Sequence, residues 1–472
     1  MPAGADRFAP FAARMQAEGL PEIVIQTFKH YYQELVAGRT GFISEADIQP
    51  IASLPRAETL PERLAGVGGA ALAKTILLKL NGGLGTSMGL ERAKSLLVVK
   101  NGLSFLDIIA RQALQTGVPL VLMNSFSTRA DSLAALEKYP GLTGTSPRSP
   151  RRGKGKSDLP LDFLQHKAPK VARPDLSPVA WPQQPELEWA PPGHGDIYTA
   201  LVTSSLLERL LQAGYEYAFV SNADNLGAVM DTAILGYFVE NHLPFMMEVA
   251  DRTEADKKGG HLAGCDGRFV LRESAQCPAG EIEAFQDISR HKYFNTNNLW
   301  LNLPALQAVM TARDNILGLA MIRNAKTVDP RDPASTPVYQ LETAMGAAIT
   351  IFEGAQAIRV PRRRFAPVKT TNDLLAIRSD AYILTDDFRV APNPARSLGP
   401  PVITLDPTYY KLIDDLEARF PHGAPSLLAC KQLDIQGDFK FGPGVHLKGV
   451  VRLVNKSGPQ VEIEAGAVIE GE

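Results

Sequence analysis

The sequence predicts an α/β protein with a layered, mostly parallel sheet, a helical segment before it and a β-helix after it. Between residues 71 and 395, short apolar runs typical of strands alternate with amphipathic runs of helical length. Before them, residues 7–18 and 21–37 repeat apolar side chains at three- and four-residue steps, which predicts helices. After Leu433, apolar residues at two-residue spacing alternate with glycine turns, a pattern that suits a few β-helix coils. We therefore expect three domains, at residues 1–70, 71–395 and 396–472.

The α/β region opens on residues 76–95, which read ILLKLNGGLGTSMGLERAKS. The apolar run Ile76–Leu80 is long enough for one buried strand. Four glycines follow, and without Cβ atoms they let backbone N–H groups approach a ligand closely. Lys94 and Ser95 then add a positive charge and a hydroxyl group. A strand that ends in such a loop suits a di- or triphosphate. The plain alternative is a flexible glycine loop.

Two familiar glycine motifs do not fit this loop. A dinucleotide-binding G-x-G-x-x-G motif would need a third glycine one position before Gly89, and no suitably placed acidic residue follows. A Walker A loop would need its lysine directly after a glycine, whereas Lys94 stands well beyond the last one. The sequence therefore predicts a different kind of nucleotide loop.

The alternation of strands and helices continues along the chain. We expect strands at residues 119–123, 217–221 and 244–250, and helices at residues 104–116, 197–213 and 231–241. Ligands of open α/β sheets bind outside the carboxyl ends of the strands. The loops after Leu80, Met123 and Ser221 should therefore surround one crevice.

Composition narrows the possible functions. The 472 residues carry a net charge of −2, which argues against broad binding to nucleic acid or to an anionic membrane. No apolar run approaches the roughly 18 residues of a membrane helix, and no secretion signal is visible. The three cysteines have no metal-ligand spacing and are expected to be free thiols of a cytoplasmic protein. The basic segment 141–156 predicts a solvated surface loop, with a phosphate-sensing lid as the alternative.

Two polar clusters precede predicted helices. His194 lies in the sequence PPGHGD, where glycines open the backbone beside a helix N-terminus that would favour an anion. Asp224 lies in SNADN, directly after a predicted strand, and a carboxylate there is well placed to hold Mg²⁺ beside substrate phosphates. A structural role for His194 and helix capping by Asp224 are the alternatives.

Two further clusters are expected in loops. The segment 294–298 carries three asparagines, whose amides sugar hydroxyls would satisfy, although a turn built on asparagine side chains is equally compatible. Lys369 stands beside two threonines ahead of a helical run at residues 373–377, which suggests a second phosphate contact. The three arginines at residues 362–364 could take part in this phosphate contact, or they could only form a solvated face.

Eight motifs follow one another along the chain: LKLNGGLGTSMG with AKS, MNSF, PPGHGDIY, SNADNLG, KGG, FNTNNLW, YQLETAMGAA and PVKTTNDLL. In this order they resemble the eukaryotic-type UTP–glucose-1-phosphate uridylyltransferase family, also called UDP-glucose pyrophosphorylases. The resemblance runs from about residue 20 to the C-terminus. It implies a Rossmann-like nucleotidyltransferase domain with a mixed, mostly parallel sheet, an N-terminal helical extension and a C-terminal left-handed β-helix.

The resemblance also implies a reaction. UTP and α-D-glucose 1-phosphate would form UDP-glucose and pyrophosphate, reversibly and with Mg²⁺, by in-line attack of the sugar phosphate on the α-phosphorus of UTP. Such a transfer depends on positioning and charge neutralisation rather than on a covalent intermediate. Self-association through the edge of the β-helix is a further expectation, with a simple cap as the alternative.

Matched by motif, the resemblance implies roles for individual residues. The nucleotide would contact Gly82, Gly83, Met123, Gln165 and Gly193. The catalytic cations would be Lys94 and Lys369, and Asp224 would bind the metal. The sugar phosphate and sugar would contact His194, Asn222, Gly260, Asn295 and Asn297. Two other functions stay open: a uridylyltransferase for other sugar 1-phosphates, such as N-acetylglucosamine 1-phosphate, and a non-catalytic UDP-sugar-binding protein.

Overall fold

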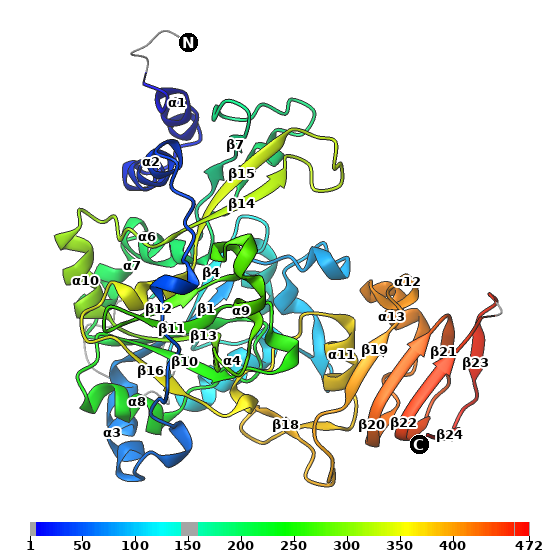
Figure 1. Cartoon of the computed structure of the whole chain (residues 1–472). Coiled ribbons are helices and arrows are strands. Elements are labelled where there is room, and N and C mark those ends of the chain that lie inside the picture. The colour runs from blue at the N-terminus through cyan, green and yellow to red at the C-terminus, as the bar shows by residue number, and fades with distance from the viewer. Residues whose placement is uncertain (1–5, 143–158, 457, 472) are drawn as a thin grey trace.

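A mixed β-sheet forms the centre of the molecule (Figure 1). The computed structural model describes residues 6–142, 159–456 and 458–471, and within them this sheet has nine strands in the order β12-β11-β13-β9-β1-β4-β5, with β10 and β16 continuing from β13. The strands are β1 (Thr75–Asn81), β4 (Leu120–Asn124), β5 (Asp162–Leu164), β9 (Tyr217–Asn222), β10 (Phe245–Asp251), β11 (His261–Cys265), β12 (Arg268–Arg272), β13 (Tyr293–Asn302) and β16 (Gln356–Arg359). Strand β1 pairs in parallel with both β4 and β9, whereas β13 pairs antiparallel with β9 and β10. The predicted α/β class and the parallel centre of the sheet are confirmed.

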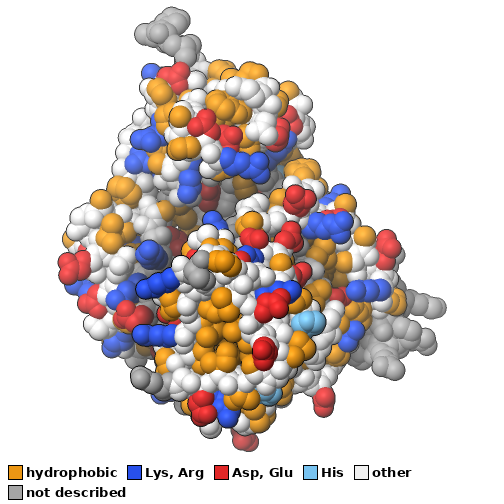
Figure 2. Space-filling view, turned by 90° about the vertical axis from the view of Figure 1, so that its right-hand side faces the viewer, with side chains coloured by type: hydrophobic (Ala, Val, Ile, Leu, Met, Phe, Trp, Pro, Cys, Tyr) orange, Lys and Arg blue, Asp and Glu red, His pale blue; other side chains and the backbone are white. Residues whose placement is uncertain are grey.

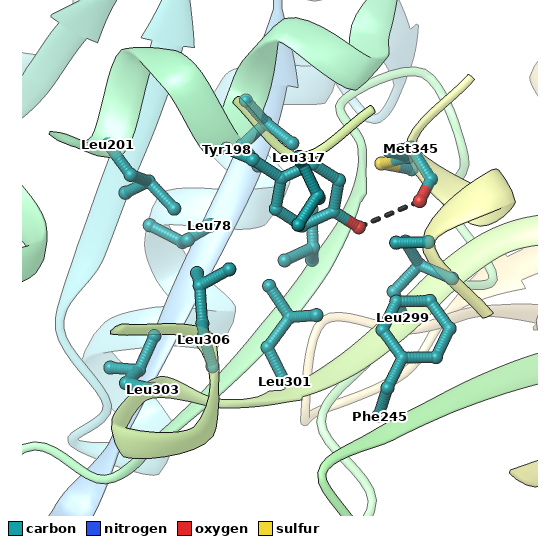
Figure 3. Packing of buried hydrophobic residues seen from close by; sticks show 14 of the residues in the cluster. Leu78, Tyr198, Leu201, Phe245, Leu299, Leu301, Leu303, Leu306, Leu317 and Met345 are labelled. Atoms are coloured by element: carbon teal, nitrogen blue, oxygen red, sulfur yellow. Dashed lines mark hydrogen bonds between the residues drawn. The ribbon is translucent and has the colours of Figure 1, made fainter. Parts of the chain in front are cut away.

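Helices cover both faces of this sheet because alternate residues of each strand point to opposite sides. Ile76 and Leu78 pack under α6 (Ile197–Thr203), α7 (Leu206–Gln212) and α10 (Leu303–Ala312). In Figure 3 the Tyr198 hydroxyl donates to the Met345 carbonyl, 2.7 Å away, within this apolar layer. Leu77 packs on the other face with α4 (Phe105–Thr116) and α8 (Thr232–Glu240). Such two-sided burial explains why the strands read as continuous apolar runs.

The N-terminal helices pack on a small separate sheet. Helices α1 (Ala9–Ala17) and α2 (Glu22–Val36) bury a group of aromatic side chains against β7 (Val171–Ala172), β14 (Met321–Thr327) and β15 (Pro337–Thr343). Both predicted N-terminal helices are therefore present, at the top of Figure 1. A third helix, α3 (Arg63–Ala71), crosses α8 so closely that a Cβ on Gly68 would lie 1.8 Å from the Thr232 carbonyl oxygen. Only glycine allows this approach.

The C-terminal region is built from short parallel strands that alternate between two sheets. Strands β19 (Val402–Leu405), β20 (Ser426–Gln436), β22 (His446–Val454) and β24 (Val468–Glu470) form one sheet, and β21 (Phe439–Phe441) and β23 (Val461–Ile463) form the other. Their inward side chains share a core with α11 (Thr371–Arg378), α12 (Pro407–Tyr410) and α13 (Ile413–Arg419). The predicted short strands with glycine turns are present.

Two predicted elements differ from the structure. The helix expected at residues 197–213 is two helices, because Ser205 adopts a left-handed backbone (φ 57°) between α6 and α7. The asparagines expected in a loop at residues 294–298 lie inside β13 instead. The strand tolerates them because its register with β10 shifts at Glu248, and Asn297 takes a positive φ of 57°, which asparagine adopts more readily than most residues.

The basic segment lies almost entirely outside the described residues, which resume at Leu159. Among the residues that are described, none of the helices combines the length and the apolar character needed to cross a membrane.

Candidate active site

A pocket of about 340 Å³ lies at the carboxyl ends of β1 and β9. Four segments far apart in the sequence line it, together with Gln165 after β5: residues 80–83, residues 94–95, residues 191 and 193–194, and residues 222–224. The Ser125 hydroxyl, in the loop after β4, donates to the Gly82 carbonyl over 2.9 Å. The loops after Leu80, Met123 and Ser221 therefore meet at one end of the sheet, as predicted.

Glycines form one wall of the pocket. A Cβ on Gly82 would lie 2.6 Å from Oε1 of Gln165, so the amide of Gln165 can lie beside the strand end only because residue 82 is glycine. The Gln165 backbone N–H donates to the Asn124 carbonyl over 2.8 Å, which fixes this residue at the end of β4. Gly193 has a φ of +81° and packs so tightly that a Cβ would lie 2.4 Å from the Thr343 carbonyl oxygen. An amide set in a glycine wall can read the polar edge of a flat base.

Met123 lies elsewhere. Its side chain is buried on β4 among the apolar residues of the sheet, and it is not one of the residues that line the pocket. Alternation along β4 explains this position, because Met123 shares the face of Val121, which packs under α6 and α7.

The charged part of the pocket is the pair Lys94–Asp224. Lys94 Nζ donates to Asp224 Oδ2 over 2.7 Å, and 15% and 25% of these two side chains are exposed. The hydroxyl of Ser95 is buried at the pocket and has no hydrogen-bond partner among the residues that the structure describes. A buried hydroxyl without a partner is costly. A phosphate oxygen would satisfy Ser95 and would also bind Lys94.

His194 presents a neutral imidazole to the pocket. Its Nδ1 accepts a hydrogen bond from the Met345 N–H over 2.9 Å, so Nδ1 carries no proton. Burial lowers the pKa of His194 to about 4. The ring at neutral pH is therefore the tautomer with its proton on Nε2, and it can donate one hydrogen bond without adding charge.

The pocket suits a metal ion whose ligands are mostly waters and substrate phosphates rather than protein side chains. Among the described residues no group of three or more His, Cys, Asp or Glu side chains could hold a metal. Asp224 supplies one carboxylate, and Mg²⁺ characteristically binds through one or two carboxylates plus waters and substrate phosphates.

The predicted sugar-binding residues form a second cluster beside the pocket. The Asn295 N–H donates to the Gly260 carbonyl over 3.0 Å, and the Asn295 amide donates to Asn297 Oδ1 over 2.9 Å. Asn222 lines the pocket itself at the end of β9, next to β13, which carries the other two asparagines. The third amide of the segment, Asn298, is fully buried and donates to Glu248, so its role is structural.

Glu273 also belongs to this cluster, although no motif in the sequence indicates it. Its carboxylate accepts a hydrogen bond from Asn295, and a Cβ on Gly260 would lie 2.5 Å from it. Burial raises the pKa of Glu273, with the Asn295 hydrogen bond and the Lys369 charge acting in the opposite direction. Arg272-Glu273 reads in the sequence as an ordinary polar strand end, so only the fold brings this carboxylate to the asparagines.

Lys369 lies apart from Lys94 in this structure. Its Nζ lies over the rings of Phe294 and Phe365, 5.9 and 5.6 Å from their centroids, and it does not line the pocket. The preceding residue, Val368, donates its N–H to the Asp224 carbonyl over 3.3 Å. The loop of Lys369 is therefore attached to the loop of Asp224, while its ammonium group faces the Glu273 side of the site.

A buried polar network supports the floor of the pocket. Lys79 on β1 is 1% exposed and donates to the Ser221 hydroxyl over 2.5 Å and to the Ala228 carbonyl over 2.9 Å. Burial lowers the pKa of Lys79 to about 7, and the nearby charge of Arg364 acts in the same direction. These bonds tie β1 to both ends of the loop that carries Asp224. The sequence signal was a lysine within an apolar strand.

The fold and the pocket define an α/β protein with a charged, glycine-walled pocket at the strand ends of its sheet, where open α/β sheets bind their ligands. The comparisons make the assignment specific: residues 25–448 match the family model of UTP–glucose-1-phosphate uridylyltransferase. The chain belongs to this family.

Individual relatives agree with the family assignment. The UTP–glucose-1-phosphate uridylyltransferase of Solanum tuberosum is 43% identical over 84% of this chain and 80% of its own length. A probable enzyme of the same name from Schizosaccharomyces pombe is 39% identical over 94% of this chain and 85% of its own. A crystal structure of a UDP-glucose pyrophosphorylase variant from Leishmania major, in complex with UDP-glucose, is 42% identical, with a TM-score of 0.88 over 100% of this chain and 99% of that one.

Proposed function

We propose that this protein transfers the uridylyl group of UTP to glucose 1-phosphate, forming UDP-glucose and pyrophosphate in a reversible reaction. The observation that carries the proposal is the Lys94–Asp224 pair at a glycine-walled pocket in a chain of this family. An oxygen of the sugar phosphate would attack the α-phosphorus of UTP in line, and the bond from that phosphorus to the pyrophosphate oxygen would break. Positioned charges are the main requirement of such a transfer.

The residues divide into a nucleotide side and a sugar side. Gly82, Gly83 and Gly193 would line the nucleotide, with Gln165 against the uracil edge. Lys94 and Lys369 would neutralise phosphate charge from two directions, and the neutral Nε2–H of His194 would donate to the sugar phosphate. Asn222, Gly260, Asn295 and Asn297 would hold the sugar, and we add Glu273 because it contacts this cluster. Met123 would contribute to the nucleotide side only indirectly, through the packing of β4.

Asp224 is the residue that we propose to hold the metal ion, and Mg²⁺ is the ion that its chemistry favours. The bound ion would neutralise phosphate charge and orient the two substrates. Lys94, which contacts the Asp224 carboxylate in this structure, would bind the phosphates when that carboxylate holds an ion instead.

The alternatives are separated by one experiment. Purified protein is given UTP, Mg²⁺ and a panel of sugar 1-phosphates that includes N-acetylglucosamine 1-phosphate, and pyrophosphate release is followed. Release with glucose 1-phosphate well above that with the other sugars is expected. Equal rates across the panel would favour a uridylyltransferase of wider specificity. A complete lack of release together with tight UDP-glucose binding would leave only a UDP-sugar-binding protein.

The C-terminal coils are a candidate self-association surface, and we propose that they wind as a left-handed β-helix whose open edge pairs with a second copy. Val454, Val461 and Val468 of the last coils are 50%, 37% and 57% exposed. Figure 2, which faces the right-hand side of Figure 1, shows hydrophobic side chains gathered on this side of the molecule. Exposed parallel edges readily pair with further strands. We also propose the domain limits 1–70, 71–395 and 396–472, which the separate N-terminal aromatic core and C-terminal core favour.

Deletion of the residues after Leu433 tests the association. We expect the full chain to elute as an oligomer in size-exclusion chromatography with light scattering, and the shortened chain to elute as a monomer. A full-length chain that carries a charge at Val468 (Val468→Lys) should behave in the same way while keeping the C-terminal core. A monomeric full-length protein would show that the coils only cap the core.

A further inference from the structure

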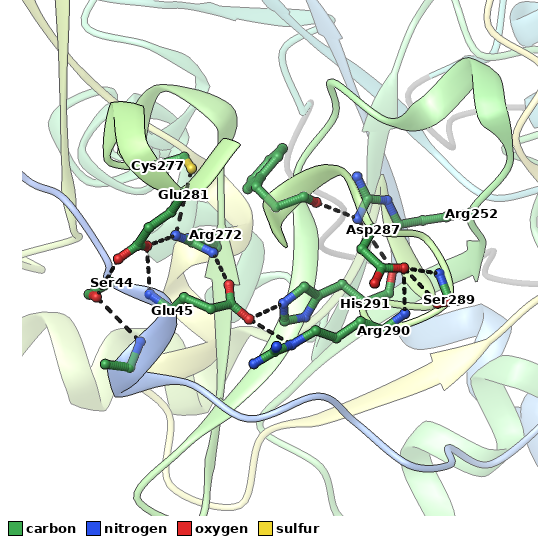
Figure 4. A network of polar contacts seen from close by, with 12 residues as sticks. Ser44, Glu45, Arg252, Arg272, Cys277, Glu281, Asp287, Ser289, Arg290 and His291 are labelled. Carbon is green, nitrogen blue, oxygen red and sulfur yellow. Dashed lines mark hydrogen bonds and ion pairs between the residues drawn. The ribbon is translucent and has the colours of Figure 1, made fainter. Parts of the chain in front are cut away.

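The segment after the N-terminal helices is fastened to the sugar side of the site. The Ile43 N–H donates to the Gln276 carbonyl over 2.8 Å, and Gln49 and Gly264 exchange two backbone hydrogen bonds of 2.8 Å. This segment therefore lies along β11, β12 and the chain that follows them. Its one carboxylate that enters the polar network in Figure 4 is Glu45.

Glu45 is the centre of that network. Its Oε2 accepts from Arg272 over 2.5 Å, and its Oε1 accepts from Arg290 and from His291, each over 2.8 Å. The side chains of Arg272 and His291 are fully buried, and 13% of the Glu45 side chain is exposed. A buried arginine held by carboxylates is costly to leave unpaired, so the position of Arg272 depends on Glu45. Arg272 also contacts Glu281 over 2.6 Å, which keeps part of its charge paired.

Two routes lead from Glu45 to the predicted sugar-binding residues. Arg272 directly precedes Glu273, whose backbone N–H is fixed by Gln276 Oε1 over 3.0 Å. On the other side, His291 stacks on His261 with ring centroids 4.0 Å apart, and His261 directly follows Gly260. The Glu273 carboxylate packs directly against Gly260, where an added Cβ would lie 2.5 Å from it. Glu45 thus holds Arg272, the neighbour of Glu273, and His291, which stacks on the neighbour of Gly260.

We propose that Glu45 is a positioning residue for the sugar half of the substrate: by holding Arg272 and His291, it fixes how Glu273 packs against Gly260 in the wall on which the sugar binds. The inference rests on the proposed function, because it takes the Glu273–Gly260–Asn295 cluster as the sugar site. It assigns the N-terminal segment a part in the site, although no residue of that segment lines the nucleotide pocket.

The test compares two ligands that differ only in the sugar. Glu45→Gln keeps the shape of the side chain but removes its charge, and its amide N–H group would face the donors of Arg290 and His291. By isothermal titration at neutral pH, the Kd of UDP-glucose should rise about three- to tenfold, the usual size of coupling through a packed network, while the Kd of UDP stays within about twofold. In steady-state assays the KM of glucose 1-phosphate should rise and the KM of UTP should not.

Two further variants make the result specific. Glu283→Gln removes an exposed carboxylate of α9 (Ile282–Gln286), near the same network, and should leave both dissociation constants unchanged. Glu45→Asp keeps the charge on a shorter side chain and should recover part of the lost UDP-glucose affinity. If Glu45→Gln does not fold, the Asp variant supplies the same comparison of UDP-glucose with UDP.

The outcomes separate this inference from the proposed function. The inference would be overturned if the dissociation constants of UDP and UDP-glucose changed equally. It would also be overturned if the melting temperature fell while both dissociation constants stayed unchanged, because Glu45 would then only stabilise the fold. A wild-type protein that binds UDP and UDP-glucose equally well and releases no pyrophosphate would instead contradict the proposed function.

Discussion

Replacing Lys94 with alanine is expected to lower kcat/KM for UTP by about a hundred- to a thousandfold, the usual cost of removing a positioned charge from a transfer site. Lys94 is the cation of the pocket that lies against Asp224, 2.7 Å away. Without it the pocket keeps the Asp224 carboxylate and must still take up a polyanion. Most of the loss should fall on kcat, because the charge at the α-phosphorus develops as the bond to pyrophosphate breaks.

The matched control for Lys94→Ala is Lys74→Ala. Lys74 also forms an ion pair, with Glu216 over 2.6 Å, but both side chains are well exposed and lie away from the pocket. Exposed pairs contribute little to stability, so this variant should keep wild-type kinetics. Circular dichroism and thermal melting of both variants establish that each is folded. Unchanged turnover in a folded Lys94→Ala protein would remove Lys94 from the phosphate site.

The second large effect is expected for Asp224→Asn, which should raise the Mg²⁺ concentration for half-maximal activity by about tenfold or more. An amide oxygen is a weaker ligand than a carboxylate for a hard cation, whereas the side-chain volume is unchanged. The amide oxygen can still accept from Lys94, so the local fold should persist. Activity is measured against total Mg²⁺ at saturating UTP and glucose 1-phosphate, and the maximal rate reached at high Mg²⁺ should also fall.

Asp386→Asn provides the comparison for Asp224→Asn, because Asp386 is an exposed carboxylate in the turn between β17 (Tyr382–Leu384) and β18 (Val390–Pro392). Its metal titration should match that of the wild type. An Asp224→Asn titration that overlays the wild-type curve would assign the metal to other groups, and the phosphates of UTP would then be its main ligands.

Much of the fold follows from local patterns in the sequence. The apolar run Ile76–Leu80 and the helical period before residue 37 predicted elements that the structure contains, because burial on both faces of a strand gives a continuous apolar run and burial of one helix face gives a helical period. The helix at residues 197–213 was predicted as one element, since the apolar period continues across the break. The helix is interrupted by the left-handed backbone of Ser205, which the spacing of apolar residues does not indicate.

The motifs of the sequence brought part of the candidate site together. Lys94, Asp224 and His194 line one pocket, in agreement with their motifs. Met123 does not, because its motif gives a position in the chain and not the face of β4 on which the side chain lies. Glu273 and Glu45 carry no motif of their own.

The sequence by itself determined the class of fold, the family and the glycine loop that we propose for the nucleotide, because each depends on residues that are neighbours in the chain. Only the tertiary structure decided which charges meet. Lys94 reaches Asp224 across 130 positions of sequence, and Glu45 reaches His291 across 246. Such contacts depend on how strands pair and segments pack, so the residues that fix the geometry of the sugar side became visible only in the folded chain.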